Sequence, residues 1–192
     1  MPRPSLAHIR TEEMLDAFMR CVARFGLDGS TLERISEEAE VGRPMLRHYL
    51  GNRDQMVEKL IAHVMAKFEA MNEALFSSLP DDDRVSVLLD ILFSDAAHEE
   101  DNAAVFQALV AASDRHKSVA EQLLKFVNDF EAGIARELMR AYPRADLQSC
   151  SVVATGITAI YFNHDATLPL GPTSHWREKS RSAVELLLKS LG

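Results

Sequence analysis

Residues Ser30 to Arg53 read STLERISEEAEVGRPMLRHYLGNR, a segment with the pattern of two short helices joined by a tight turn. Leu32 and Ile35 fall on one face of the first helix, because residues three or four apart lie on the same side of a helix. We expect Ser30 to cap this helix, with Glu33 as the reciprocal capping partner three residues later. The first half of the segment therefore predicts a short amphipathic helix.

The second half of the segment predicts a turn, a second helix and the start of a third. Glu40-Val41-Gly42 forms the turn, and Pro44 suits the opening of the next helix, where the first N–H groups have no partner within the helix. Gly51 ends that helix, and Asn52 caps the following one with Gln55 at the capping-box position. This is the layout of a helix-turn-helix, whose second helix enters the major groove of DNA.

The order of these signals resembles the N-terminal DNA-binding domain of the TetR (tetracycline-repressor-like) family of bacterial transcriptional regulators, over about the first 60 residues. The family usually has glycine where Glu40 stands and commonly has tyrosine where Arg47 stands. The resemblance rests on Phe25-Gly26, Ser30-Thr31-Leu32, Ile35, Ala39, Val41, Leu46, His48-Tyr49-Leu50 and Gly51-Asn52-Arg53.

The rest of the 192-residue chain predicts an all-α fold of about nine helices, because proline and glycine are sparse and lie mostly between apolar periodic segments. We expect a helix-turn-helix DNA-binding domain over residues 1–52 and a larger helical effector-binding and dimerisation domain over residues 53–192. Outside the two short helices, the expected helices are Leu6–Phe25, Arg53–Phe76, Arg84–Ala97, Asn102–Ala112, Ser118–Tyr142, Asp146–His164 and Ser174–Leu191. Asp81-Asp82-Asp83 and Asn102 are expected to cap the helices that follow them.

Charge is unevenly distributed along the chain. The net charge is −8, which is not typical of a nucleic-acid-binding protein. Residues 1–60 hold nine basic and ten acidic side chains, a net charge of −1, and the remaining residues carry −7. Between Gly42 and Arg53 there are three arginines and no acidic residue. The predicted reading helix is therefore locally positive, as contact with phosphates requires.

The predicted DNA-binding residues lie on the exposed side of the second helix and at the starts of its neighbours: Thr31, Arg43, Pro44, Met45, Arg47, His48, Tyr49 and Arg53. Arg43 and Arg47 are candidates for bidentate contacts to guanine. The other polar residues are candidates for phosphate contacts, and Pro44 shapes the helix start. Replacing Arg47 should weaken specific binding by about 1–3 kcal/mol if it reads a base, whereas an equal loss on random DNA would identify a phosphate contact.

A small-molecule effector and a second subunit are the other expected partners. Aromatic and methionine side chains on the later helices could line an effector cavity, with plain core packing as the alternative reading for each: Met65, Phe68, Phe93, Phe106, Phe126, Phe130 and Tyr161. Residues Asp146–His164 are apolar all round, so this helix is expected in the core or against another subunit. The last two helices could form a four-helix bundle with a two-fold mate. The resemblance implies the same homodimer.

Catalytic, metal and membrane functions find no support in the sequence. We find no phosphate loop or nucleophile motif, and we predict no enzyme, cofactor or metal site. The histidines make no two-residue ligand pair one helical turn apart: His98, His116, His164 and His175. Cys21 and Cys150 are expected as buried free thiols. No signal peptide or bilayer-spanning stretch is apparent, which indicates a cytoplasmic protein.

We therefore expect a one-component transcriptional regulator, with repression as the family's usual mode. It would bind a palindromic double-stranded DNA operator as a homodimer and be released by a ligand in the C-terminal domain. The alternative is a helical ligand-binding or protein-interaction module whose helix-turn-helix no longer binds specific DNA. Its support is the acidic balance and the acids beside the reading helix, Glu37, Glu38 and Glu40, which would repel phosphate.

Overall fold

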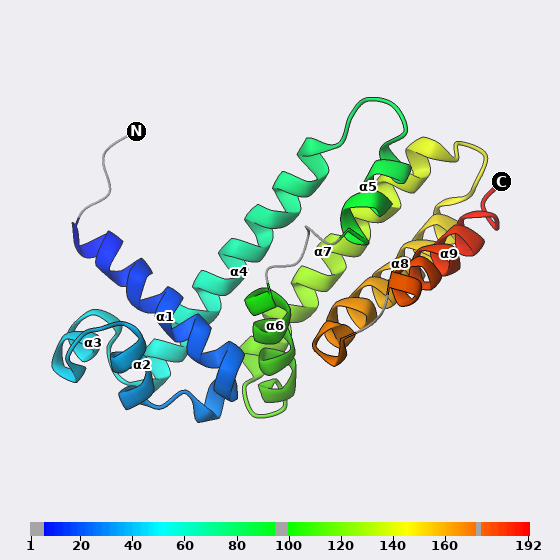
Figure 1. The fold of residues 1–192 in the computed structure, drawn as a ribbon. Helices are drawn as coiled ribbons and strands as arrows, with labels where there is room; N and C mark the ends of the chain where they lie inside the picture. Colours follow the sequence, from blue (N-terminus) through cyan, green and yellow to red (C-terminus); the bar gives the residue numbers. More distant parts are fainter. Residues whose placement is uncertain (1–5, 95–99, 172–173) are drawn as a thin grey trace. The chain divides into compact units, whose positions relative to one another are not determined.

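The computed structural model describes residues 6–94, 100–171 and 174–192 (Figure 1). These residues form nine α-helices, one short 3-10 helix and no strand, so the all-α prediction is confirmed. The helices are α1 (Leu6–Gly29), α2 (Leu32–Glu38), α3 (Arg43–Leu50), α4 (Arg53–Ser78), α5 (Arg84–Leu92), α6 (Glu100–Ala112), α7 (Lys117–Ala141), α8 (Leu147–Thr167), the 3-10 helix η2 (Leu168–Leu170) and α9 (Ser174–Leu188).

The chain divides into two compact units. The first contains residues up to Glu69 together with Glu100–Leu123, and the second contains Ala70–Glu99 together with Leu124–Gly192. The helix-turn-helix and α6 therefore belong to the first unit, whereas α5, α8 and α9 belong to the second. The domain boundary that the sequence suggests after Asn52 stays a prediction.

In the first unit, α1 packs against α2, α3 and α6. Gly26 interrupts α1 with φ 70° and ψ 172°, which is where the sequence predicts the helix to end. Phe18 of α1, Ile35 of α2 and Leu46 of α3 are fully buried, and they anchor the three helices to one another. Phe25, the last residue of the expected first helix, is 46% exposed, and the Arg34 guanidinium lies 4.2 Å from its ring centroid.

The predicted cap of α2 is wrong by one residue. Thr31 is the N-cap, and its hydroxyl accepts a hydrogen bond from the Arg34 backbone N–H at 3.3 Å. Ser30 is buried instead, and its hydroxyl donates to the Gly26 carbonyl at 2.7 Å. The reason is the break at Gly26, which frees a carbonyl that Ser30 satisfies from within the core.

The turn and the third helix agree more closely with the sequence. Glu40 has φ 53°, the left-handed region in which glycine is favoured. Pro44 lies in the first turn of α3, and Gly51 ends that helix with φ 92°. Asn52 and Gln55 form the predicted capping box, in which the Asn52 side chain accepts from the Gln55 N–H at 3.0 Å and the Gln55 side chain accepts from the Asn52 N–H at 2.9 Å.

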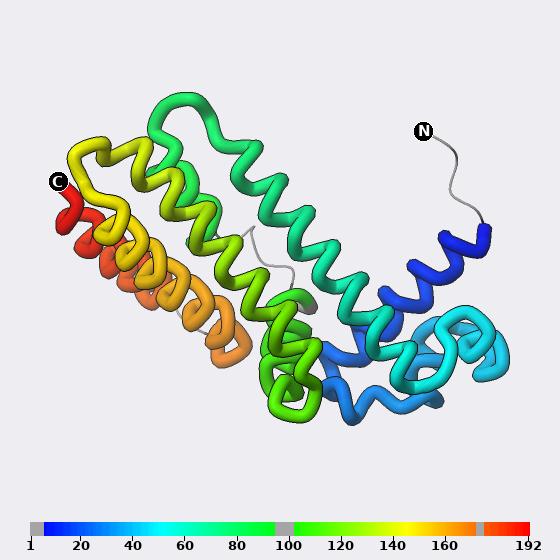
Figure 2. The backbone as a smooth tube through the Cα atoms, turned by 180° about the vertical axis from the view of Figure 1, so that it is seen from behind, coloured from blue at the N-terminus to red at the C-terminus, as the bar shows by residue number. Residues whose placement is uncertain are grey.

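In the second unit, α8 and α9 run side by side (Figures 1 and 2). The core of this unit is made by apolar side chains of α5, α7, α8 and α9, among them Leu88, Ile134, Ile157 and Val184. Residues of this unit therefore bury one side of α8, as the uniformly apolar sequence of that helix predicts.

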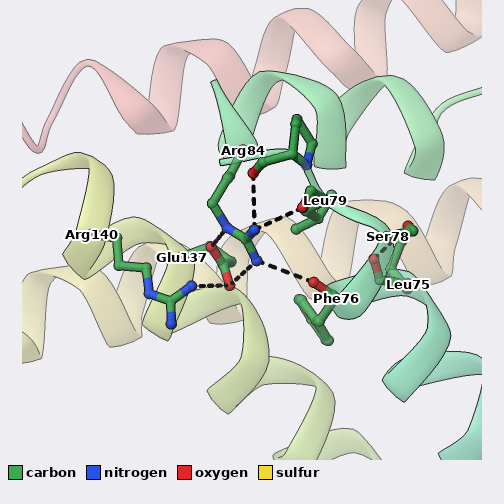
Figure 3. Close-up of polar contacts among 8 residues, drawn as sticks. Leu75, Phe76, Ser78, Leu79, Arg84, Glu137 and Arg140 are labelled. Atoms are coloured by element: carbon green, nitrogen blue, oxygen red, sulfur yellow. Dashed lines mark hydrogen bonds and ion pairs between the residues drawn. The ribbon is translucent and has the colours of Figure 1, made fainter. Parts of the chain in front are cut away.

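A buried ion pair holds α5 to α7. The Arg84 guanidinium donates to the Glu137 carboxylate at 2.6 and 3.1 Å (Figure 3). The same guanidinium donates to the backbone carbonyls of Phe76, Leu79 and Pro80, at 2.8 to 3.1 Å. Arg84 thus satisfies one carbonyl in the last turn of α4 and two in the segment that follows it.

Three further sequence expectations are corrected. The helix expected over Arg84–Ala97 ends at Leu92, and residues 95–97 lie outside the described part of the chain. Asp83 is the N-cap of α5 but has φ 54° and makes no side-chain capping bond, so the acidic run does not cap the helix as predicted. Asn102 lies inside α6 instead of at its start.

Candidate nucleic-acid interface

The surface of α3 is sharply divided between buried and exposed side chains. Leu46 and Leu50 are fully buried and hold the helix against the first unit. Met45 is 46% exposed, and Arg47 and His48 are also exposed. The exposed face of α3 therefore carries the side chains that the sequence assigns to DNA.

Arg43 lies at the start of α3 and contacts α2 across the turn. Its Nη2 donates to Oε1 of Glu33, in the first turn of α2. Both side chains are more than half exposed. The sequence expects Glu33 as a capping partner of Ser30, whereas the structure pairs it with Arg43.

Arg47 lies in the last turn of α3, beside the start of α4. Its side chain lines a surface depression of about 500 Å³ together with Leu32, Gly51, Asn52, Arg53 and Met56. Among the residues the structure describes, nothing offers the Arg47 side chain a hydrogen bond or an ion pair. Arg47 is thus a positive charge available to a ligand at this edge of α3.

Arg53 is held by backbone carbonyls. Its guanidinium donates to the carbonyls of Ser30 at 2.9 Å and Leu27 at 2.6 Å, and it lies 5.2 Å from the Phe18 ring centroid. Burial lowers the pKa of Arg53, although the nearby Asp28 opposes that shift. The structure therefore gives Arg53 a structural task, tying the start of α4 to the chain that precedes α2.

The acids beside α3 are partly neutralised. Glu38 accepts hydrogen bonds from Arg20 at 2.6 Å and Arg24 at 2.9 Å, both on α1. The bond from Arg20 is the main reason that the pKa of Glu38 lies below its ordinary value. Glu37 and Glu40 remain exposed to solvent. Two of the acids near the reading helix, Glu33 and Glu38, thus carry arginine partners and repel phosphate less than the bare sequence suggests.

The remaining predicted contacts lie around the two ends of α3. The hydroxyl of Thr31 caps α2 at an exposed position. The ring of His48 meets the ring of Tyr49 edge-on, with centroids 5.2 Å apart. Lys59, which sequence reasoning does not single out, donates from Nζ to the Tyr49 carbonyl at 2.8 Å. Lys59 lies ten residues after Tyr49, and no sequence pattern connects the two, so this contact could not be predicted from the sequence.

Comparisons with known proteins show which proteins this chain resembles in sequence and in fold. No protein-family model matches the chain. HTH-type transcriptional regulator BetI 2 from Chromohalobacter salexigens is 26% identical over 165 residues, which are 83% of this chain and 77% of that protein. A structure described as a TetR-family transcriptional regulator from Rhodococcus sp. has the same fold, with a TM-score of 0.72, 16% identity, and coverage of 95% of this chain and 98% of that one. The chain is thus similar in sequence to a curated HTH-type transcriptional regulator and shares its fold with a TetR-family regulator.

The curated relatives are transcriptional regulators, which supports DNA-binding regulation rather than enzymatic activity for this chain. A further solved structure with this fold is the transcriptional regulator FadR from Bacillus subtilis in complex with stearoyl-CoA, with a TM-score of 0.61 and 13% identity over 94% of this chain and 98% of that one. Regulators of the TetR family bind DNA and small-molecule effectors and act as dimers.

The aromatic and methionine residues predicted to line an effector cavity fall into the two units. Met65, Phe68 and Phe106 belong to the first unit, where the rings of Phe68 and Phe106 lie 6.3 Å apart. In the second unit the Tyr161 ring lies 6.3 Å from Phe93 and 5.7 Å from Phe130. Phe126 also belongs to the second unit and is half-buried.

Tyr161 and Thr158 are polar residues of α8 in this second unit. Burial raises the pKa of Tyr161, and the nearby Asp165 raises it further, so the phenol stays neutral. The Thr158 hydroxyl is buried, and the described part of the chain gives its oxygen no hydrogen-bond partner. A buried polar atom of this kind is a candidate for contact with a bound molecule.

The outer face of α8 and α9 is apolar yet exposed. Leu147 and Val152 of α8 and Leu186 of α9 are each about two-thirds exposed. A groove of about 400 Å³ runs between the two helices and is lined by Ala159, Ile160, Asn163, Trp176, Lys179, Ser180 and Ala183. The second unit therefore leaves exposed aliphatic side chains on the two helices that the sequence assigns to dimerisation.

The described ranges contain neither a cluster of metal ligands nor a helix suited to span a membrane. Within residues 6–94, 100–171 and 174–192, no three His, Cys, Asp or Glu side chains gather closely enough to hold a metal ion. His98 lies outside these ranges. Cys21 and Cys150 are buried free thiols, as predicted. None of the described helices has the length and apolar character needed to cross a bilayer.

Proposed function

We propose that this chain acts in the cytoplasm as a homodimeric TetR-family repressor that binds a two-fold symmetric operator and is released by a small molecule. The observation that carries the proposal is the exposed face of α3, where Arg43, Arg47 and His48 project from a helix anchored by buried leucines. Such a short, well-anchored helix at the protein surface fits the major groove.

The contacts divide between the two ends of α3. In helix-turn-helix proteins the N-terminal residues of the reading helix contact base edges, which assigns base recognition to Arg43 and Met45. Arg47 lies in the last turn beside the start of α4, where side chains and helix N-termini contact phosphate. Thr31, His48 and Tyr49 supply further phosphate contacts. Arg53 acts by holding the start of α4 in place.

The second subunit is proposed to cover the apolar face of α8 and α9. A two-fold interface uses the same patch on both subunits, and two helices from each would form a four-helix bundle. The exposed Val152 and Leu186 would then be buried in the dimer. Two reading helices would be held about 10 base pairs or a little more apart, one turn of DNA.

The ligand is proposed to bind in the second unit, near Tyr161 and Thr158. Support comes from the aromatic surroundings, the buried unpartnered hydroxyl of Thr158 within the described residues, and the stearoyl-CoA complex of FadR from Bacillus subtilis. If ligand and operator favour different conformers, each weakens the affinity for the other by the same factor. Release by the ligand follows from that linkage.

The test is selection of bound duplexes from a random DNA pool with the purified full-length protein at near-physiological salt. The proposal expects enrichment of a two-fold symmetric site with half-sites about 10 base pairs apart. Protein that has been refolded free of small molecules serves as the second sample, because a co-purified ligand would suppress binding. If neither sample enriches a sequence while the protein is folded and dimeric, the regulator proposal is wrong and the non-DNA-binding module is favoured.

A further inference from the structure

The contact between Glu33 and Arg43 joins the two helices of the helix-turn-helix. Glu33 lies in the first turn of α2, and Arg43 is the first residue of α3. The side chains are 63% and 54% exposed, respectively, so the pair lies at the protein surface. The helix dipole favours negative charge in the first turn of a helix, so the position of the Glu33 carboxylate in α2 is a favourable one.

The ion pair uses only part of the Arg43 guanidinium. Nη2 contacts Glu33 Oε1, and the described residues show no second partner for this arginine. A guanidinium carries five N–H donors in a rigid fork, so most of the fork stays available. Guanine presents two acceptors, O6 and N7, which such a fork can meet together.

Holding one edge of the guanidinium has a consequence for recognition. A free arginine side chain loses several rotamers when it is fixed against a base, and that ordering opposes binding. A side chain that a neighbour already holds loses fewer rotamers when it binds a base. It also approaches the base edge in one orientation, so its preference among bases is sharper.

We propose that Glu33 is a positioning residue for base recognition, which holds Arg43 in the orientation in which its guanidinium reads a base edge. The inference rests on the proposed function, because it requires α3 to enter the major groove. Glu33 acts through Arg43 and does not itself contact DNA. A carboxylate that only added negative charge to this surface would weaken binding to every sequence alike. A carboxylate that orients Arg43 changes the preference among sequences.

Glu37 provides a matched control. It lies on the same helix one turn after Glu33, its side chain is exposed, and the described residues give it no ion pair. Glu33→Gln and Glu37→Gln remove the same charge from the same helix. Arg43→Lys keeps the positive charge and removes the fork. Thermal melting of each full-length variant establishes that it is folded, as expected for exposed positions.

The experiment selects bound duplexes from a random pool with wild-type protein and with each variant, and compares base frequencies position by position. Arg43→Lys is expected to lose preference at one symmetry-related pair of positions, by about fivefold or more. Glu33→Gln is expected to lower preference at the same pair by about two- to fivefold, while Glu37→Gln leaves it unchanged. The double variant Glu33→Gln with Arg43→Lys should lose no more preference than Arg43→Lys alone.

Three outcomes separate failure of this inference from failure of the proposed function. If Glu33→Gln keeps the wild-type base preferences and tightens binding to all DNA as Glu37→Gln does, Glu33 is an ordinary surface charge and the inference is overturned while the regulator proposal stands. A loss of preference at positions unrelated to those of Arg43→Lys also overturns it. If the wild-type protein enriches no two-fold site, the proposed function fails and the positioning role fails with it.

Discussion

The α2–α3 surface and the α8–α9 surface are both exposed, but their side chains differ in kind. The face of α3 presents long polar and charged groups, such as Arg47 and His48. The outer face of α8 and α9 presents aliphatic groups, such as Val152 and Leu186. Positively charged side chains bind most favourably to a polyanion, whereas exposed aliphatic side chains are stabilised most by burial against an apolar partner. The contrast indicates which kind of partner each surface takes.

The ionic contacts of the two regions differ in the same way. Beside α3 the pair of Glu33 with Arg43 is exposed, and an exposed pair contributes little to the free energy of folding. In the second unit the Glu137 side chain is only 6% exposed in its pair with Arg84. Buried pairs are costly to break, so that pair fixes the structure. The predictions below test this division, from the largest expected effect to the smallest.

A charge placed on the apolar face of α8 should dissociate the dimer. Val152→Glu introduces a good helix former but buries two carboxylates, one from each subunit, in the proposed symmetric interface, which costs about 3 kcal/mol or more. Sedimentation velocity on the full-length protein measures the monomer fraction. Leu124→Glu, at another exposed leucine on α7, is the control. If Val152→Glu stays as dimeric as the control, the dimer uses another surface.

Breaking the buried pair should destabilise the fold far more than removing its exposed neighbour. Glu137→Ala leaves the Arg84 guanidinium without its carboxylate and is expected to lower the free energy of unfolding by about 2 kcal/mol or more. The exposed Arg140 side chain contacts the same carboxylate at 3.4 Å. Arg140→Ala removes this contact and should change the free energy of unfolding by less than about 0.5 kcal/mol. Urea denaturation measures both. Equal effects would mean that the buried pair has no special structural role.

The same pair predicts a pH dependence. Hydrogen bonds from Arg84 hold the pKa of Glu137 below its ordinary value of 4.5, despite burial. Its contribution to stability is therefore fully present above the ordinary carboxylate pKa and is lost as the pH falls through the lower, folded-state value. Between pH 6 and pH 3, wild-type stability should fall more steeply than that of Glu137→Gln, because the variant has lost this titration. If denaturant melts give the same pH dependence of the free energy of unfolding for the wild-type protein and Glu137→Gln, this prediction is contradicted.

The turn before α3 should tolerate, and even benefit from, a glycine. Glu40 has φ 53°, so Glu40→Gly relieves left-handed strain and should raise the free energy of unfolding by about 1 kcal/mol. Glu37→Gly, inside α2, should lower it by about 1 kcal/mol. The difference in melting temperature between the two variants checks the sign. A destabilised Glu40→Gly would mean that the glutamate side chain makes a compensating contact.

Local signals in the sequence predicted the helices and several of their ends. Gly26, Gly51 and the Asn52–Gln55 capping box act within a few residues of themselves, so their roles could be read from the chain. Ser30 was assigned wrongly because the break at Gly26 turns it inward, which depends on how α1 ends rather than on the cap pattern.

Contacts between elements could not be predicted in the same way. Arg53 looks like a phosphate ligand in the sequence, yet it reaches the Leu27 and Ser30 carbonyls because α1, α2 and α4 pack together. The partners of Glu38 lie on α1, fourteen and eighteen residues earlier, and no periodic pattern connects them. The roles proposed for Arg43 and Arg47 on DNA stay predictions, because they depend on the position of the operator.

The most direct test of DNA recognition by α3 is the affinity of the purified dimer for its enriched duplex and for a scrambled duplex, measured as salt is raised. The account predicts that the enriched duplex binds about 1,000-fold more tightly or better, with log affinity falling linearly with log salt concentration. Arg47→Gln should weaken both duplexes by the same factor and reduce the salt slope by about one, as a phosphate contact does. Equal affinity of the wild-type protein for the two duplexes would contradict sequence-specific recognition by α3.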